Sequence, residues 1–76
     1  MTKLEEKLIE LDYMLETHTY IKRLKGNIAL CIYVTPKRLI GGVEYDTFFM
    51  YKNQINNLQQ AFNQLQKDLE VLKEYE

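Results

Sequence analysis

The feature that most constrains the fold is an apolar stripe in the last third of the chain. Its spacing of three and four residues places its members on one side of an α-helix. The pattern predicts a long C-terminal helix that begins near Lys52 or Asn53. An earlier start, with Asp46 as the N-cap, is the alternative. The stripe consists of Ile55, Leu58, Phe62, Leu65, Leu69 and Leu72.

The length of this helix raises the question of what the stripe contacts. At 1.5 Å per residue, a helix over residues 52–76 is about 37 Å long, whereas strands of five or six residues span about 17–20 Å. The stripe has three possible partners: the chain's own sheet, a second copy of the chain, or a groove on another protein. In a coiled-coil homodimer, Ile55, Phe62 and Leu69 take the a positions and Leu58, Leu65 and Leu72 the d positions.

A second helix is predicted at the N-terminus. Thr2 and Glu5 have the spacing of a capping box, in which each side chain bonds the backbone amide of the other residue. An apolar stripe follows and predicts a short helix that ends between Asp12 and Glu16. This stripe comprises Leu4, Leu8, Leu11 and Leu15.

The middle of the chain has the alternation of β-strands. Residues 17–25, THTYIKRLK, are rich in β-branched and aromatic residues. Residues 28–34 alternate, with apolar residues in both sets, which predicts a central strand covered on both faces. A third strand is expected over residues 39–47, with a possible extension to Met50.

Turns separate these strands. Gly26-Asn27 and Thr35-Pro36-Lys37-Arg38 have turn chemistry. Gly41-Gly42, inside the third strand, predicts a bulge or a sharp bend. The expected fold is therefore α+β, in the order α-β-β-β-α, with a three-stranded antiparallel sheet between a short N-terminal and a long C-terminal amphipathic helix.

Size and composition limit how such a fold is stabilised. We expect the 76 residues to form a single domain, 1–76, whose core is small for independent stability. One cysteine and one histidine exclude an intramolecular disulfide and a structural zinc site, and no cofactor is expected. Oligomerisation is the remaining source of support. Neither a signal peptide nor a membrane span is expected, which indicates a cytoplasmic protein.

Charge is unevenly distributed along the chain. Residues 17–43 contain five basic residues and no acidic one, between two acidic segments. Cations beside exposed aromatic rings are typical of sheets that bind single-stranded nucleic acid, and the same residues suit an acidic protein surface. The candidate partner-binding residues are Lys22, Arg23, Lys25, Lys37, Arg38, Tyr20 and Tyr33.

Catalytic residues are not indicated. His18 has no nucleophile and orienting carboxylate at a recognisable spacing. Cys31 lies among apolar residues and is expected to be a small buried side chain. We therefore expect no enzymatic activity.

The two ends of the chain carry a resemblance. The segments NLQQAFNQLQKDLEVLKEYE and MTKLEEKLIEL resemble small uncharacterised proteins encoded by phages and prophages of Gram-positive bacteria. The resemblance implies a protein that acts without catalysis, by binding and blocking a host replication factor, transcription factor or CRISPR nuclease. No site residue is carried over from it.

Taken together, the sequence favours a non-enzymatic protein-binding module. We expect an inhibitor or regulator of a host protein that forms a homodimer through its C-terminal helix. The alternative is a small nucleic-acid-binding protein that uses the basic segment 17–43.

Overall fold

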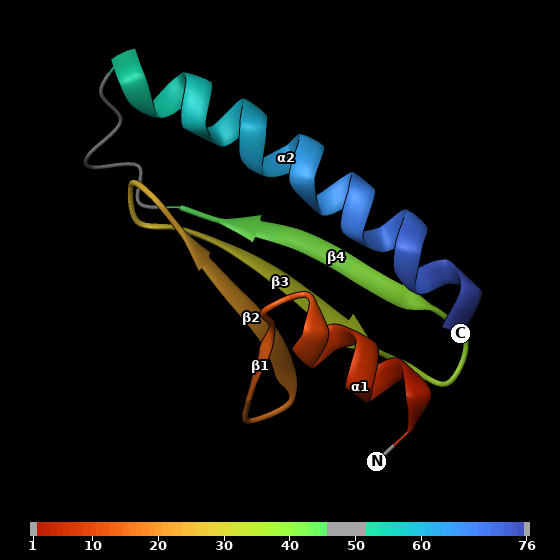
Figure 1. Ribbon diagram of the computed structural model, residues 1–76. Coiled ribbons are helices and arrows are strands. Elements are labelled where there is room, and N and C mark those ends of the chain that lie inside the picture. Colours follow the sequence, from red (N-terminus) through yellow and green to blue (C-terminus); the bar gives the residue numbers. More distant parts are fainter. Residues whose placement is uncertain (1, 46–51, 76) are drawn as a thin grey trace.

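The computed structural model describes residues 2–45 and 52–75 and shows an α+β fold (Figure 1). The strands form one antiparallel sheet in the order β1-β2-β3-β4. A short N-terminal helix, an antiparallel sheet and a C-terminal helix were all predicted, but the sheet has four strands rather than three. The elements are α1 (Lys3–Glu10), β1 (Met14–Glu16), β2 (Thr19–Leu24), β3 (Ile28–Val34), β4 (Leu39–Glu44), α2 (Lys52–Leu72) and the 3-10 turn η2 (Lys73–Tyr75).

The additional strand, β1, lies where the sequence predicted the end of the first helix. The capping box at Thr2 forms as expected, but α1 already ends at Glu10. Asp12 then adopts a left-handed backbone conformation (φ 72°), which turns the chain into β1. Leu15 continues the helical spacing in sequence, yet it lies in β1 and is exposed.

Both helices pack on the same face of the sheet, which we call the covered face. Three alternate residues of β3, Ile28, Leu30 and Ile32, point to this face and form the centre of the core. Leu8 of α1 and Leu65 of α2 are buried against them. Figure 1 shows α2 running along β4 and β3, with α1 near the C-terminal end of β3.

Helix α2 starts at Lys52, as predicted, and lies very close to β4. A Cβ atom added to Gly41 would lie 2.9 Å from Cδ1 of Leu69, so the absence of a side chain allows the helix to approach. The predicted bulge at Gly41-Gly42 is wrong, because the pairing of β3 with β4 continues without interruption through both glycines. The strand ends at Glu44, one residue before Tyr45, which was predicted to belong to it. The predicted continuation to Thr47 or Met50 lies outside the described residues.

The opposite side of the sheet, which we call the open face, differs from the prediction. Central strand β3 was expected to be covered on both faces, but both described helices lie on one. A Cβ atom added to Gly42, which points to the open face, would have no heavy atom within 4 Å. The four-stranded sheet therefore has one packed and one exposed apolar surface.

Candidate functional site

The open face is apolar at its centre. One row of paired residues crosses all four strands, from Met14 through Ile21 and Cys31 to Gly42. In the next row of this face, Tyr33 pairs with Ile40. The exposed fractions are 71% for Met14, 43% for Tyr33 and 42% for Ile40. Tyr33 and Ile40 are thus exposed neighbours across β3 and β4, and neighbouring exposed apolar side chains are typical of protein interaction sites.

An ion pair spans this apolar row. Arg23 Nη1 lies 2.6 Å from Glu16 Oε2, and Arg23 Nη2 lies 3.2 Å from Glu16 Oε1, so the contact is bidentate. The hydrogen bond from Arg23 lowers the pKa of the Glu16 carboxyl. Both residues point to the open face, on either side of the Met14–Ile21 pair. The ion pair therefore joins β1 and β2 across the Met14–Ile21 pair.

Cys31 lies under these side chains and is almost fully buried. Burial, and then the nearby Glu44 carboxylate, raise the pKa of its thiol. A thiol that stays protonated is a poor nucleophile. Cys31 is therefore a small buried side chain, as the sequence predicted.

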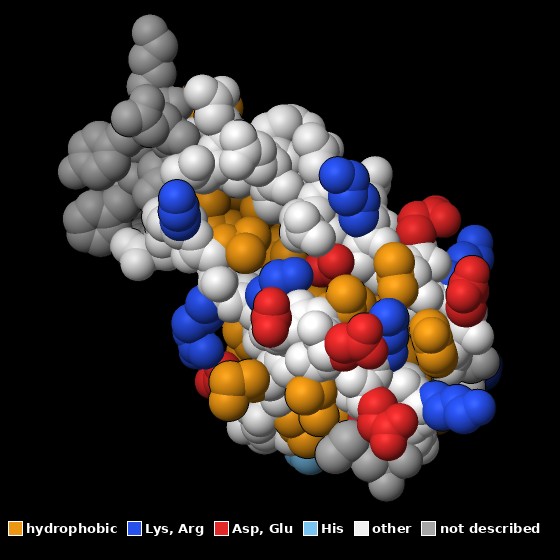
Figure 2. Space-filling model, in the orientation of Figure 1, with side chains coloured by type: hydrophobic (Ala, Val, Ile, Leu, Met, Phe, Trp, Pro, Cys, Tyr) orange, Lys and Arg blue, Asp and Glu red, His pale blue; other side chains and the backbone are white. Residues whose placement is uncertain are grey.

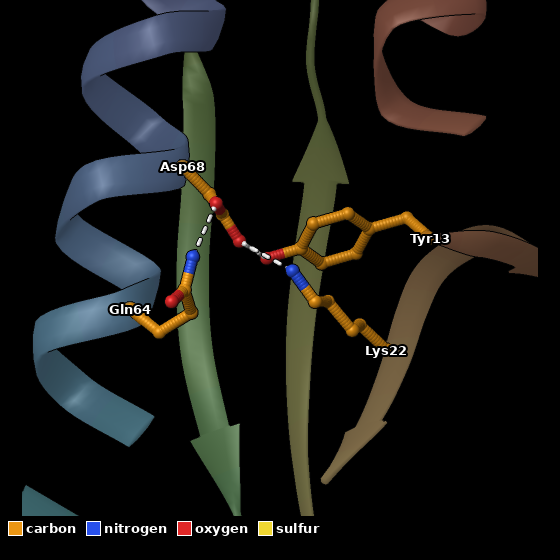
Figure 3. A network of polar contacts seen from close by, with 4 residues as sticks. All are labelled: Tyr13, Lys22, Gln64 and Asp68. Carbon is orange, nitrogen blue, oxygen red and sulfur yellow. Dashed lines mark hydrogen bonds and ion pairs between the residues drawn. The ribbon is translucent and has the colours of Figure 1, made fainter. Parts of the chain in front are cut away.

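A polar network is buried on the covered face, between α2 and the sheet (Figure 3). Asp68 of α2 is 3% exposed. Its Oδ2 accepts hydrogen bonds from the Tyr13 hydroxyl at 2.7 Å and from Lys22 Nζ at 3.2 Å, and its Oδ1 accepts one from Gln64 Nε2 at 2.9 Å. Lys22 Nζ also lies 5.2 Å from the centre of the Tyr13 ring. The network joins α2 to β2 and to the segment that follows α1.

This network has the chemistry of a structural contact. Burial, and then the hydrogen bond to Asp68, raise the pKa of Tyr13 well above its usual range. The phenol therefore stays neutral and donates to the carboxylate, and the positive charge of Lys22 balances the negative charge of Asp68. Sequence analysis did not single out Asp68. Its spacing from Ala61, Leu65 and Leu72 was the signal that it faces the core.

The basic segment does not form one patch. Lys22 is partly buried beneath α2, whereas Arg23 lies on the open face. Lys25 precedes the turn at Gly26-Asn27, and Lys37 and Arg38 lie in the turn at the opposite end of β3. On the side of the molecule seen in Figure 2, Lys and Arg side chains are scattered among acidic ones.

The two candidate aromatic residues are separated in the same way. Tyr20 is buried on the covered face, and Tyr33 is partly exposed on the open face. The predicted cations and rings are thus divided between the two faces of the sheet rather than gathered on one.

The C-terminal stripe is divided between core and surface. Leu65 and Leu72 are buried, and Leu58 and Leu69 are partly buried against the core. Ile55 is 60% exposed and Phe62 is 46% exposed. The stripe therefore packs mainly on the chain's own sheet, and only its outer flank is available to another molecule.

A shallow hollow lies between the first half of α2 and the end of β2. Apolar side chains are visible inside a hollow on the surface in Figure 2. Amide side chains of α2 and one lysine form much of its polar lining, which offers no acid and base pair. The lining residues are Leu24, Lys25, Asn57, Gln60, Ala61 and Gln64.

Comparisons with known proteins assign neither a family nor a function to this chain. Neither a family model, nor a curated protein, nor a solved structure matches this chain. In the described ranges 2–45 and 52–75, no three His, Cys, Asp or Glu side chains are placed to hold a metal ion. Over the same ranges, no helix has the length and apolar character needed to cross a membrane.

Proposed function

We propose that this protein is a non-enzymatic binding module that uses the open face of its sheet to bind another protein. The observation that carries the proposal is the exposure of Met14, Tyr33 and Ile40 on a regular four-stranded layer. A sheet gains stability when each apolar face packs against a further layer. The open face lacks such a layer among the described residues and so offers a docking surface.

The occupant that we propose is an amphipathic helix of the partner. Two helices of this chain already pack on the covered face of the sheet. The open face is formed by the same strands, at the same spacing, and can therefore receive a helix from another protein in the same way. The apolar stripe of the incoming helix would lie along Tyr33 and Ile40. Its polar flank would lie beside the Arg23–Glu16 ion pair.

The absence of catalysis is part of the proposal. The titratable groups Tyr13, Lys22 and Asp68 converge, but they lie on the covered face, away from the proposed docking surface. Because burial raises the pKa of Tyr13, its hydroxyl does not act as a base near neutral pH.

The class of partner follows from the resemblance of the chain ends to phage proteins. Such a protein would bind a bacterial host protein and block it. We therefore propose that the partner is a host protein whose exposed amphipathic helix is needed for its activity.

A pull-down from a Gram-positive bacterial lysate tests this proposal. The double variant Met14→Lys/Tyr33→Lys places two charges on the open face and is expected to lose the partner. Val71→Lys is the matched control, because Val71 is also an exposed apolar residue but lies on α2. Circular dichroism confirms that each variant is folded. A protein retained equally by all three chains would show that binding does not use the open face.

A further inference from the structure

Helix α2 carries a second stripe beside the residues that pack on the sheet. Its members recur at spacings of four and three residues, so they share one flank of the helix. Two of its apolar side chains are well exposed, Ile55 by 60% and Phe62 by 46%. We call this set the outer stripe, and it consists of Ile55, Gln59, Phe62, Gln66 and Leu69.

The outer stripe lies on the flank of α2 that points away from the centre of the sheet. Helix α2 runs along β4, the last strand of the sheet (Figure 1). Ala61 and Asp68 lie on the side of α2 that faces β2. Phe62 and Gln66 therefore lie on the opposite flank. None of the described helices or strands packs on this flank.

This flank is unusually poor in charge. Residues 53–66 contain no Asp, Glu, Lys or Arg, although 28% of the residues in the chain are charged. The exposed side of a surface helix is ordinarily charged, whereas the centres of protein interfaces are depleted of charge. A Gln side chain both donates and accepts hydrogen bonds, so it can pair with the same residue type on another chain. The flank is therefore suited to burial against a neutral surface.

We propose that the outer stripe packs against the outer stripe of a second copy of this chain, with the two α2 helices antiparallel and centred on Phe62. The stripe is nearly symmetric about this residue. Ile55 and Leu69 each lie seven positions from Phe62, and Gln59 and Gln66 lie three and four positions away. A two-fold axis at Phe62 therefore brings apolar residues to apolar residues and amides to amides.

The shape of the surface fits this pairing. Leu69 lies directly over Gly41, and it borders one hollow with Gln66 and another with Lys73. The exposed side chain of Ile55 of the partner subunit can enter the space beside Leu69, as side chains do between paired helices. At the centre, the rings of the two Phe62 residues meet, and aromatic pairs add stability beyond the area that they bury.

Charges in the second half of α2 favour the antiparallel direction. In a parallel pair, Lys67 and Glu70 would each lie near the same residue of the partner subunit, so like charges would meet. In the antiparallel pair, both lie beside the uncharged segment 53–66 of the partner subunit. Like-charge repulsion therefore opposes only the parallel arrangement.

This arrangement changes the predicted route of self-association. The sequence predicted a coiled-coil seam, but Leu65 and Leu72 of that seam are buried in the monomer core. Only the other side of the seam, with Ile55 and Phe62, is exposed. The open face lies on the other side of the sheet from α2, so the dimer does not depend on whether that face binds a host protein.

Sedimentation equilibrium from low to high micromolar concentration tests the dimer. We expect the wild type to approach twice the 9.1 kDa mass of one chain. Phe62→Glu should raise the dimer dissociation constant at least about tenfold, because two carboxylates then face each other across the axis. Ile55→Glu, at the end of the stripe, should act in the same direction.

Val71→Glu is the matched control for these variants. Val71 is 40% exposed and lies nine residues from Phe62, about two and a half turns, on the far side of α2. Its dissociation constant should equal that of the wild type, and circular dichroism confirms that each variant is folded. A wild type that stays monomeric, or a Val71→Glu variant that dissociates as readily as Phe62→Glu, would overturn the proposal.

Two double variants test the direction of the helices. Gln59→Lys/Gln66→Glu places opposite charges face to face in the antiparallel dimer and should lower its dissociation constant about fivefold at low salt. Gln59→Glu/Gln66→Glu should raise the constant by a similar factor. Both lose the same weak contact between Gln59 and Asn63, so their difference reports the partner subunit. Weakening by both variants, as a parallel pair requires, or no change in either, would contradict antiparallel pairing centred on Phe62.

Discussion

The covered and open faces of the sheet differ most clearly where neighbouring residues point to opposite sides. Lys22 is partly buried and forms an ion pair with the buried Asp68, whereas Arg23 forms an exposed one with Glu16. A side chain at Gly41 would collide with Leu69, whereas one at Gly42 would meet nothing. The two residues of each comparison are neighbours in the same strand and differ only in the face to which they point. The contrast between them therefore reports the effect of the helices that cover one face.

Truncation of the central strand should give the largest difference between the faces. Leu30→Ala removes a fully buried side chain from the core and should lower the free energy of unfolding by about 4 kcal/mol. Cys31→Ala removes a smaller side chain from the open face and should cost less than about 1 kcal/mol. Urea denaturation measures both values. Equal losses would show that the open face is packed as tightly as the covered one.

The two ion pairs should differ almost as much. Asp68→Ala leaves the Lys22 ammonium and the Tyr13 hydroxyl without their acceptor and should cost about 3 kcal/mol. Glu16→Ala should produce no measurable loss, because both partners of that pair are exposed to water. Thermal unfolding followed by circular dichroism compares the two variants. A large effect of Glu16→Ala would mean that the exposed pair is needed to hold β1 in place.

The two glycines allow the two faces to be compared by adding a side chain instead of removing one. Gly41→Val overpacks the contact with Leu69 and should cost about 2 kcal/mol. Gly42→Val adds a side chain with high β-propensity on the open face and should leave stability unchanged or raise it slightly. Chemical denaturation of the two variants gives the difference. A loss at position 42 equal to that at position 41 would contradict an open second face.

The covered face should also make stability depend on alkaline pH, through Tyr13. Because the folded state raises the pKa of Tyr13, the phenol ionises in the unfolded chain first. Its stabilising contribution is complete below about pH 10 and is lost as pH rises further, at about 1.4 kcal/mol per unit. Denaturation midpoints between neutral and alkaline pH measure this slope. Tyr13→Phe should reduce it, and an unchanged slope would assign the effect to other groups.

Local sequence patterns predicted the elements that depend on short-range chemistry. The capping box at Thr2, the start of α2 at Lys52 and the turn at Gly26-Asn27 all follow from neighbouring residues, and the structure confirms them. The strand β1 was missed because Leu15 extends the helical spacing by coincidence. The helix ends before Leu15, and the backbone of Asp12 is left-handed. The spacing of apolar residues does not reveal this change of conformation.

The candidate site was harder to predict, because it depends on which face each residue occupies. Lys22 and Arg23 are adjacent in sequence and were assigned to one basic surface, yet the pleat of β2 sends them to opposite faces. Likewise, the apolar residues of β3 indicated burial on both faces without showing that only one face receives helices. The face on which each residue lies, and the face on which the helices pack, depend on tertiary structure. Local sequence patterns therefore could not predict either of them.

The position of Cys31 gives the protein an internal reporter of its own local motions. It is the chain's only cysteine, and it is buried on a face that no described helix covers. A thiol reagent can reach it only when the surrounding side chains or the β1–β2 hairpin move aside, so the labelling rate measures the free energy of that opening. Any molecule that docks on the open face should slow this reaction in proportion to its occupancy, which turns one unmodified residue into a binding assay.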